Sequence, residues 1–287
     1  GMRKKQISTV IHEDLETQLE TPKLNIDFIN PDAPITNLNC WIELDNLELI
    51  SGATGFTEKK LDFWSKVTQK ISTDIFSYGF FNSINFNHVG INSLFGGLVA
   101  EEVYKAITGK TTPLNQLFSW SDFSLIPKRK PNDLSSENQI TRLYGNEFYK
   151  QISNLNIFMV GSGAIGCELL KNFSVMGIAS GKSGKIIVTD PDIIEKSNLN
   201  RQFLFRPSDV GKAKSQVAKL AINKSRPKCN IEANIHKVCP KNEEIYDEAF
   251  YENLSLIANA LDNTEARLYV DSKCVMYNLP LLESGTM

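Results

Sequence analysis

The strongest constraint on the fold is a regular alternation of short apolar strands and helices that begins near residue 150. Two such strands are predicted at 156–160 (Asn-Ile-Phe-Met-Val) and 185–189 (Lys-Ile-Ile-Val-Thr). The further predicted strands are 230–238, 254–260 and 279–282, and the predicted helices are 164–178, 210–225 and 263–277. Strands that alternate with helices in this way form a parallel sheet covered by helices on both faces. We therefore predict an α/β fold with a doubly wound, mainly parallel sheet.

The first 150 residues have a different texture. Residues 1–35 are polar and interrupted by prolines, which is typical of a loop or linker. Residues 36–86 carry apolar residues at helical spacing and are expected to form a helical segment. A longer helix is predicted over 87–108, with Gly109 as its C-cap, followed by a strand over 114–126 and an exposed linker to about 138. A mainly helical region is thus expected before an α/β domain at 139–287.

Composition excludes several classes of protein. Lys and Arg total 31 against 33 Asp and Glu, a net charge of −2, so nucleic acid and anionic membranes are not the expected partners. The longest apolar run is far shorter than the roughly 18 residues that span a bilayer. The five cysteines and three histidines are scattered and form no metal-ligand or disulfide pattern. We expect a cytoplasmic or nuclear protein.

A glycine motif directly follows the first predicted strand and opens a helix. It reads Gly161-Ser-Gly163-Ala164-Ile-Gly166. Such glycines allow a tight turn, close approach of the backbone to phosphate, and close packing of helix on strand, while the helix N-terminus favours negative charge. In this strand–turn–helix context the motif predicts a nucleotide site.

A carboxylate ends the second predicted strand. Asp190 lies 24 residues after the last glycine of the motif, where an acidic side chain usually accepts hydrogen bonds from ribose hydroxyls. The glycine motif and Asp190 are equally compatible with a dinucleotide and with a mononucleotide.

The residues after Asp190 favour a triphosphate. A triphosphate with magnesium needs cations for its outer phosphates and carboxylates for the metal. Arg201 and Lys214 are candidates for the first role, and Asp192 and Asp262 for the second. Together, at the mouth of a Rossmann-like sheet, they indicate ATP and Mg²⁺.

The same residues carry a family resemblance. Five blocks in the right order resemble the ubiquitin-activating enzymes of the ThiF/MoeB-like adenylation superfamily, and the main match covers about 144–286. These blocks are 91–105, 161–173, 190–207, 259–267 and 280–286. The resemblance implies that 36–86 belongs to a helical bundle, 87–138 to the end of an inactive adenylation domain, and 139–287 to the first part of an active one.

The resemblance also implies roles for nucleotide-binding residues. Residues 161–166 would form the nucleotide loop, and Asp190 would hold the ribose. Asn198 and Arg201 would contact the outer phosphates, with Gln202 beside them.

The chemistry implied by the resemblance is adenylation of ubiquitin. Lys214 would neutralise phosphate during adenylate formation, and Asp262 would bind Mg²⁺ together with Asp192. The C-terminal carboxylate of ubiquitin would attack the α-phosphate of ATP, giving an acyl-adenylate and pyrophosphate. The implied partners are ubiquitin and ubiquitin-conjugating enzymes.

The chain is interpreted as an internal fragment of a longer protein. An apolar strand at 279–282 would be buried in a parallel sheet, yet only five residues follow it. The family's catalytic cysteine would lie beyond residue 287, so none of the five cysteines inherits that role. We expect the fragment to be inactive by itself, and its incomplete sheet to favour self-association.

Two other functions stay open. An NAD-dependent dehydrogenase would use the glycine motif and Asp190 but leaves Arg201, Lys214 and Asp262 unexplained. A non-catalytic interaction module would carry an empty nucleotide loop. Titration with ATP and with NAD distinguishes these possibilities.

Overall fold

A computed structural model describes residues 13–20, 22, 24, 89–114, 118 and 139–284. The chain divides into two compact units, Gly1–Leu143 and Tyr144–Met287. The helices predicted within 36–86 and nearly all of the strand predicted at 114–126 lie outside the described residues.

The first unit is represented by helices. They are α1 (Leu15–Glu20), α5 (Val89–Thr108) and most of α6 (Gln139–Tyr144). The predicted C-cap of α5 is confirmed, because Gly109 has a φ of 57° and its N–H donates to the carbonyl of Lys105 at 2.9 Å. Near this end, Glu102 pairs with Lys105 at 2.7 Å.

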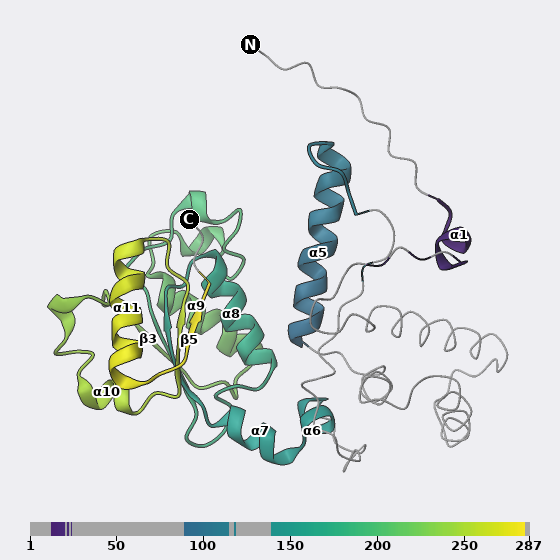
Figure 1. The fold of residues 1–287 in the computed structure, drawn as a ribbon. Coiled ribbons are helices and arrows are strands. Elements are labelled where there is room, and N and C mark those ends of the chain that lie inside the picture. The colour runs from purple at the N-terminus through teal and green to yellow at the C-terminus, as the bar shows by residue number, and fades with distance from the viewer. Residues whose placement is uncertain are drawn as a thin grey trace. The chain divides into compact units, whose positions relative to one another are not determined.

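The second unit contains a five-stranded sheet in the order β3-β2-β1-β4-β5, with every neighbouring pair parallel (Figure 1). The strands are β1 (Asn156–Val160), β2 (Lys185–Thr189), β3 (Ile231–Asn234), β4 (Leu256–Asn259) and β5 (Leu281–Glu283). The helices are α7 (Asn146–Ser153), α8 (Ala164–Val175), α9 (Lys214–Ser225), α10 (Glu248–Glu252) and α11 (Thr264–Tyr277), with short 3-10 turns η2 (Lys196–Asn198), η3 (Pro207–Asp209) and η4 (Pro240–Asn242). The predicted α/β Rossmann-like sheet is confirmed.

Strand β1 contributes side chains to both hydrophobic cores of this unit. Ile157 and Met159 pack in the core that contains residues of α8 and α9, and Phe158 and Val160 pack in the core that contains residues of α10 and α11. This division follows from the two-residue period of a strand, whose successive side chains point to opposite faces. Figure 1 shows α11 on one side of the sheet and α8 with α9 on the other.

The register of the strands positions the candidate site. Val160 lies opposite Thr189 of β2 and opposite Asn259 of β4, so these three parallel strands end at the same level. Strands are added on one side of β1 up to β3 and on its other side from β4 onward, so the strand order reverses between β1 and β4. Ligands bind at the carboxyl ends of strands at such a switch point. The loops after β1, β2 and β4 therefore meet where a ligand is expected.

Several helices and strands are shorter in the structure than the sequence predicted. The helix predicted from 210 begins at Lys214, because η3 and an antiparallel bridge between Ile193 and Ala213 take up the preceding residues. The strand predicted over 230–238 ends at Asn234. The helix predicted over 164–178 ends at Val175, since Gly177 adopts a φ of 80°.

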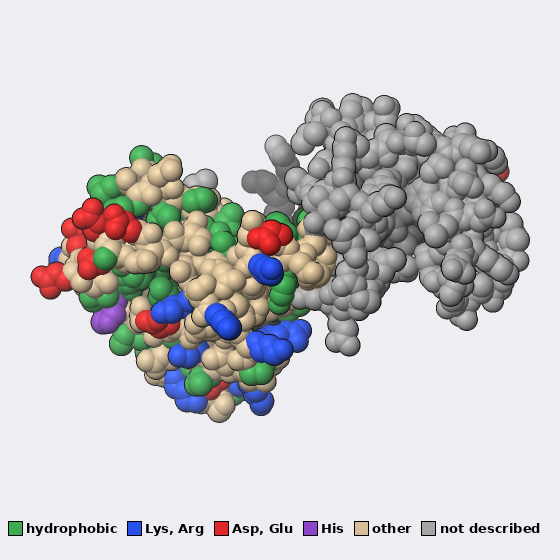
Figure 2. Space-filling view, turned by 90° about the horizontal axis from the view of Figure 1, so that it is seen from below, with side chains coloured by type: hydrophobic (Ala, Val, Ile, Leu, Met, Phe, Trp, Pro, Cys, Tyr) green, Lys and Arg blue, Asp and Glu red, His purple; other side chains and the backbone are tan. Residues whose placement is uncertain are grey.

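Charged side chains of the second unit are unevenly distributed on the face that Figure 2 shows. In the view of Figure 2, Lys and Arg side chains gather toward one edge and Asp and Glu side chains toward another. Exposed cations occur in the segments that lead into β2 and β3, namely Lys182, Lys224, Arg226 and Lys228. These segments enter the amino ends of their strands, so this basic surface is at the edge of the sheet opposite the candidate site. In the described parts of the chain, no helix is long and apolar enough to cross a membrane.

Candidate functional site

Two glycines of the motif are required by packing within the chain. Gly161 has a φ of 100°, and a Cβ there would lie 2.6 Å from the carbonyl oxygen of Ala260. A Cβ on Gly166 would lie 2.4 Å from the carbonyl oxygen of Gly161. Both distances are below any ordinary contact with a backbone atom, so the first turn of α8 packs against the strand ends only with glycine at these positions.

The middle glycine is different. Gly163 has a φ of −73°, and a Cβ there would have only the Nε2 atom of Gln202 within 4 Å, at 3.8 Å. The fold itself therefore does not require glycine at this position. A group that approached the backbone closely would require glycine here, as the phosphates of a nucleotide do at such a loop.

The N-terminus of α8 presents a row of unpaired donors. The first N–H groups of an α-helix have no partner within the helix. Among the described residues, those of Gly163, Ala164, Ile165 and Gly166 find no acceptor elsewhere. Four free amides and the positive end of the helix dipole form a binding site for an anion.

Asp190 lies beside this loop and is buried, with 6% of its surface exposed. Its Oδ2 accepts the backbone N–H of Ser162 at 2.7 Å and lies 3.3 Å from the hydroxyl of the same serine. Its Oδ1 accepts the N–H of Asp192 at 2.9 Å. The carboxylate thus binds both the glycine loop and the turn that follows β2.

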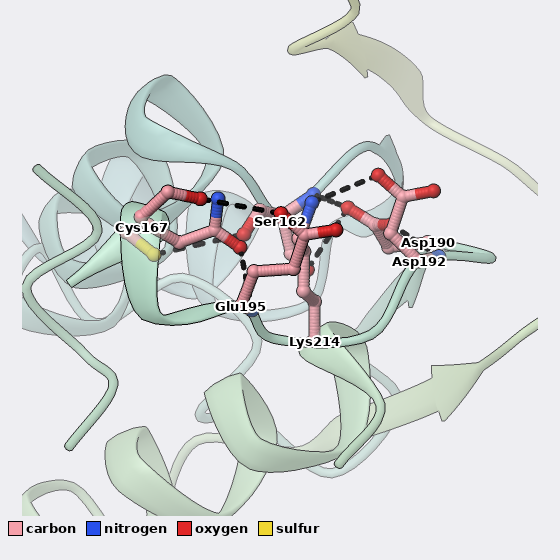
Figure 3. A network of polar contacts seen from close by, with 8 residues as sticks. Ser162, Cys167, Asp190, Asp192, Glu195 and Lys214 are labelled. Carbon is pink, nitrogen blue, oxygen red and sulfur yellow. Dashed lines mark hydrogen bonds and ion pairs between the residues drawn. The ribbon is translucent and has the colours of Figure 1, made fainter. Parts of the chain in front are cut away.

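Lys214 and Asp192 form an ion pair at the start of α9. The Nζ atom of Lys214 lies 2.8 Å from Oδ2 of Asp192, and its backbone N–H donates to the carbonyl of Asp192 at 3.0 Å. The lysine side chain is 10% exposed and the aspartate side chain 67% exposed. Figure 3 shows this pair next to Asp190 and Ser162, so a cation and two carboxylates adjoin the glycine loop.

Three candidates lie in the segment around η2. The Oδ1 atom of Asn198 accepts the N–H of Glu195 at 2.9 Å, so this amide stabilises the turn. Arg201 is exposed, and its guanidinium donates to the carbonyl of Ser197 at 3.0 Å. Gln202 is buried, and its Oε1 has no hydrogen-bond partner among the described residues. An orphaned buried amide next to Gly163 is an independent sign of a polar ligand.

Asp262 follows β4 and is exposed, without a hydrogen bond or ion pair among the described residues. The strand end below it is anchored. The Nδ2 atom of Asn259 donates to Glu283 of β5 at 3.0 Å, and Glu283 pairs with Arg267 of α11 at 3.0 Å. At the start of α11, the side chain of Asn263 accepts the N–H of Ala266 at 2.8 Å and caps the helix.

Asp192 follows β2 and Asp262 follows β4, the two strands that flank β1 and its glycine loop. No group of three or more His, Cys, Asp or Glu residues in the described ranges is arranged to hold a metal by itself. Mg²⁺ commonly binds one or two carboxylates and takes its other ligands from phosphates and water. These two aspartates fit that mode of binding.

Three cysteines of this unit are buried, namely Cys167, Cys229 and Cys274, whereas Cys239 is partly exposed. Cys167 is fully buried in α8, and burial raises the pKa of its thiol to about 12. Burial likewise raises the pKa of Cys229 and of Cys274 to about 11. These thiols are protonated at neutral pH, and a thiol is a poor nucleophile.

Sequence reasoning missed Ser162 and the Asn259–Glu283–Arg267 contacts. Ser162 is fully buried and supplies two of the contacts of Asp190. Its place between two glycines of the motif was the only available signal. The second set joins residues that are far apart in the sequence, so it depends on the pairing of β4 with β5.

Relatives of this chain include enzymes named as activators of ubiquitin or of ubiquitin-like modifiers. Ubiquitin-activating enzyme E1 1 of Candida albicans (strain WO-1) is 48% identical over 210 residues, covering 69% of this chain and 20% of that protein. Ubiquitin-like modifier-activating enzyme 6 of Homo sapiens is 38% identical over 308 residues, covering 97% of this chain and 28% of that protein. The chain spans about a fifth of the length of the first relatives that it matches.

Among solved structures, the E. coli tRNA N6-threonylcarbamoyladenosine dehydratase TcdA in complex with ATP aligns with a TM-score of 0.45 and 24% identity. The alignment covers 53% of this chain and 60% of that chain.

The glycine motif, the parallel sheet and the residues at its carboxyl edge all fall within a single match to a family model. The ThiF family model covers residues 134–287, which is more than half of the chain. This chain belongs to the ThiF family.

Proposed function

We propose that this chain is part of an ATP-dependent ubiquitin-activating enzyme and contributes to the site that adenylates ubiquitin. The observation that carries the proposal is the row of four unpaired amides at the start of α8, next to a glycine that the fold itself does not require. The similarity to ubiquitin-activating enzymes supports the choice of reaction.

In this proposal the α8 N-terminus binds phosphate oxygens and Lys214 supplies the nearby positive charge. Because Asp192 is mostly exposed, Lys214 can exchange that carboxylate for a phosphate at small cost. Arg201, also exposed, would contact the outer phosphates, and Asn198 would shape the turn that carries it. The side-chain amide of Gln202, whose Oε1 has no partner among the described residues, would contact the nucleotide beside Gly163.

Asp192 and Asp262 would hold Mg²⁺ through their carboxylate oxygens. When bound, this ion supplies positive charge that stabilises the departing pyrophosphate. The carboxylate at the C-terminus of ubiquitin would attack the α-phosphate, forming a C–O–P linkage as the bond to pyrophosphate breaks. The contribution of the chain is positioning and charge stabilisation.

The partners of the whole protein follow from the same proposal. Ubiquitin would be the substrate, and ubiquitin-conjugating enzymes would receive it in a later step. Such a protein would act in the cytoplasm and nucleus. Thioester chemistry would not use Cys167, Cys229 or Cys274, because burial keeps these thiols protonated.

Calorimetric titration of the chain with ATP in Mg²⁺, and separately with NAD, tests the nucleotide assignment. We expect ATP to bind and NAD to bind at least tenfold more weakly. Gly163→Ala should abolish ATP binding without lowering thermal stability, because the added Cβ occupies the approach of the phosphates. Tighter binding of NAD would instead support a dehydrogenase, and a folded chain that binds neither would support a non-catalytic module.

A further inference from the structure

The carboxylate of Asp190 is the centre of a network of polar contacts. It joins the glycine loop through Ser162 at 2.7 Å and the turn after β2 through the N–H of Asp192 at 2.9 Å. Asp192 in turn accepts the backbone N–H of Lys214 and pairs with its ammonium group. Figure 3 shows these groups as one chain of contacts, which runs from the loop before α8 to the first residue of α9.

The network fixes the orientation of the loop. The N–H of Gly161 donates to the carbonyl of Thr189, and the N–H of Ser162 donates to Asp190. These two amides are therefore turned toward β2, whereas those from Gly163 onward have no acceptor among the described residues. The peptide group of Ser162 lies directly before the free amides, so its orientation determines where they point.

We propose that Asp190 is a positioning residue for the phosphate site, in addition to any contact that it makes with ribose. Its carboxylate holds the glycine loop and the Asp192–Lys214 pair in one arrangement through bonds within the chain itself. The inference rests on the proposed nucleotide site, because it assigns Asp190 a role toward phosphates that it does not touch.

Electrostatics and positioning give opposite signs in the key experiment. Loss of a negative charge beside an anion site should strengthen the binding of an anion. Loss of a positioning residue should weaken it. A ligand that has phosphates but lacks ribose therefore separates positioning from both charge and ribose contact.

The experiment measures binding of magnesium tripolyphosphate and of ATP by calorimetry to the wild-type chain, Asp190→Ala and Asp190→Asn. We expect Asp190→Ala to bind tripolyphosphate at least tenfold more weakly. Asp190→Asn should recover part of this loss, because its amide oxygen can still accept the Ser162 N–H. Asp271→Ala, which removes an exposed carboxylate on α11, is the matched charge control and should change the affinity less than twofold.

Amide hydrogen exchange of Ser162, followed by NMR without any nucleotide, provides a second readout. In the wild type this N–H is buried and bonded, so its exchange should be slow, and Asp190→Ala should accelerate it at least tenfold while the β1 amides remain protected. If the wild-type chain binds neither ligand, the proposed nucleotide site is wrong. The exchange rate of the Ser162 amide then still shows whether Asp190 holds the loop in place.

Two results would overturn the inference. One is unchanged or tighter tripolyphosphate binding in Asp190→Ala, with weaker ATP binding, which would assign Asp190 to ribose alone. The other is rapid exchange of the Ser162 amide in the wild type. If Asp190→Ala does not fold, Asp190→Asn serves for the binding measurement and should still bind tripolyphosphate more weakly than the wild type, because it replaces one carboxylate oxygen of the network.

Discussion

The two halves of the sheet's carboxyl edge differ in how far their polar groups are engaged with one another. After β1 and β2, Ser162, Asp190, Asp192 and Lys214 form a continuous set of hydrogen bonds and an ion pair. After β4, Asp262 is exposed and makes no such contact with the described residues. The half of the proposed site after β1 and β2 is therefore ordered by contacts within the chain, whereas Asp262, in the other half, has no such contact to order it.

The two halves differ in the contacts of their exposed side chains and not in how firmly their strand ends are held. Below Asp262, the side chain of Asn259 is bound to Glu283 and Glu283 to Arg267, so the end of β4 is firmly held. A free carboxylate on an anchored strand end is well placed to bind a cation without rearrangement of the backbone. Substitutions on the two halves should accordingly affect different properties, namely folding on one side and chemistry on the other.

The largest effect is expected from Asp262→Ala in the full-length parent protein. Loss of a magnesium ligand should reduce ATP–pyrophosphate exchange about a thousandfold or more. The thermal midpoint should stay unchanged, because Asp262 is exposed and forms no contact among the described residues. Asp271→Ala, which removes an exposed carboxylate on the following helix α11, is the control. Near-normal exchange in Asp262→Ala would remove this residue from the site.

A pair of alanine substitutions in the glycine loop should separate folding from binding. Gly166→Ala should destabilise the chain by about 3 kcal/mol, because its Cβ would overlap the carbonyl of Gly161. Gly163→Ala should change the free energy of unfolding by less than about 1 kcal/mol, because its Cβ meets no close neighbour. Urea unfolding measures both values. Equal losses of stability would show that the fold requires glycine at 163 as well.

Buried thiols make both halves sensitive to alkaline pH. The pKa of Cys167, behind the glycine loop, is raised from 9.0 to about 12, and that of Cys274 in α11 from 9.0 to about 11. A raised pKa contributes stability that is complete below the unfolded value and is lost as pH rises toward the folded value. Each thiol should therefore cost about 1.4 kcal/mol of stability per pH unit above about 9, to pH 11 for Cys274 and to pH 12 for Cys167.

Urea unfolding at pH 8, 9, 10 and 11 measures this slope. Cys167→Ala and Cys274→Ala should each reduce it between pH 9 and 11, relative to the wild type. A slope that neither substitution alters would mean that tyrosines cause the alkaline loss; Tyr251 is the first candidate, because burial raises its pKa strongly.

The smallest effect on the free energy of unfolding, measured with urea, is expected from Asp192→Asn. Its ion pair with Lys214 involves a mostly exposed carboxylate, and exposed pairs contribute about 0–1 kcal/mol. Glu232→Gln, which breaks the half-exposed pair with Lys185 across β2 and β3, is the matched control and should cost about the same. A loss above about 2 kcal/mol for Asp192→Asn would mean that Lys214 is locked in place by this pair.

Periodicity was sufficient to predict the sheet but not the boundaries of its elements. The five strands and helices α8, α9 and α11 were predicted because each carries a clear apolar pattern. Helix α7 was missed, and the helix predicted from 210 begins only at Lys214, because short polar segments are ordered by contacts outside themselves. Cooperation between Ser162 and Asp190 depends on the register of β1 with β2, which no local pattern encodes.

Strand β1 carries the glycine loop and contributes side chains to both cores, with Ile157 and Phe158 fully buried on opposite faces. Neither helical layer can detach without exposing one of these side chains to water. Partial opening of the domain from this strand is therefore disfavoured, and β1 should exchange its amide hydrogens only through global unfolding. The loop proposed to bind phosphates is thus attached to the segment of the domain that is expected to open least often.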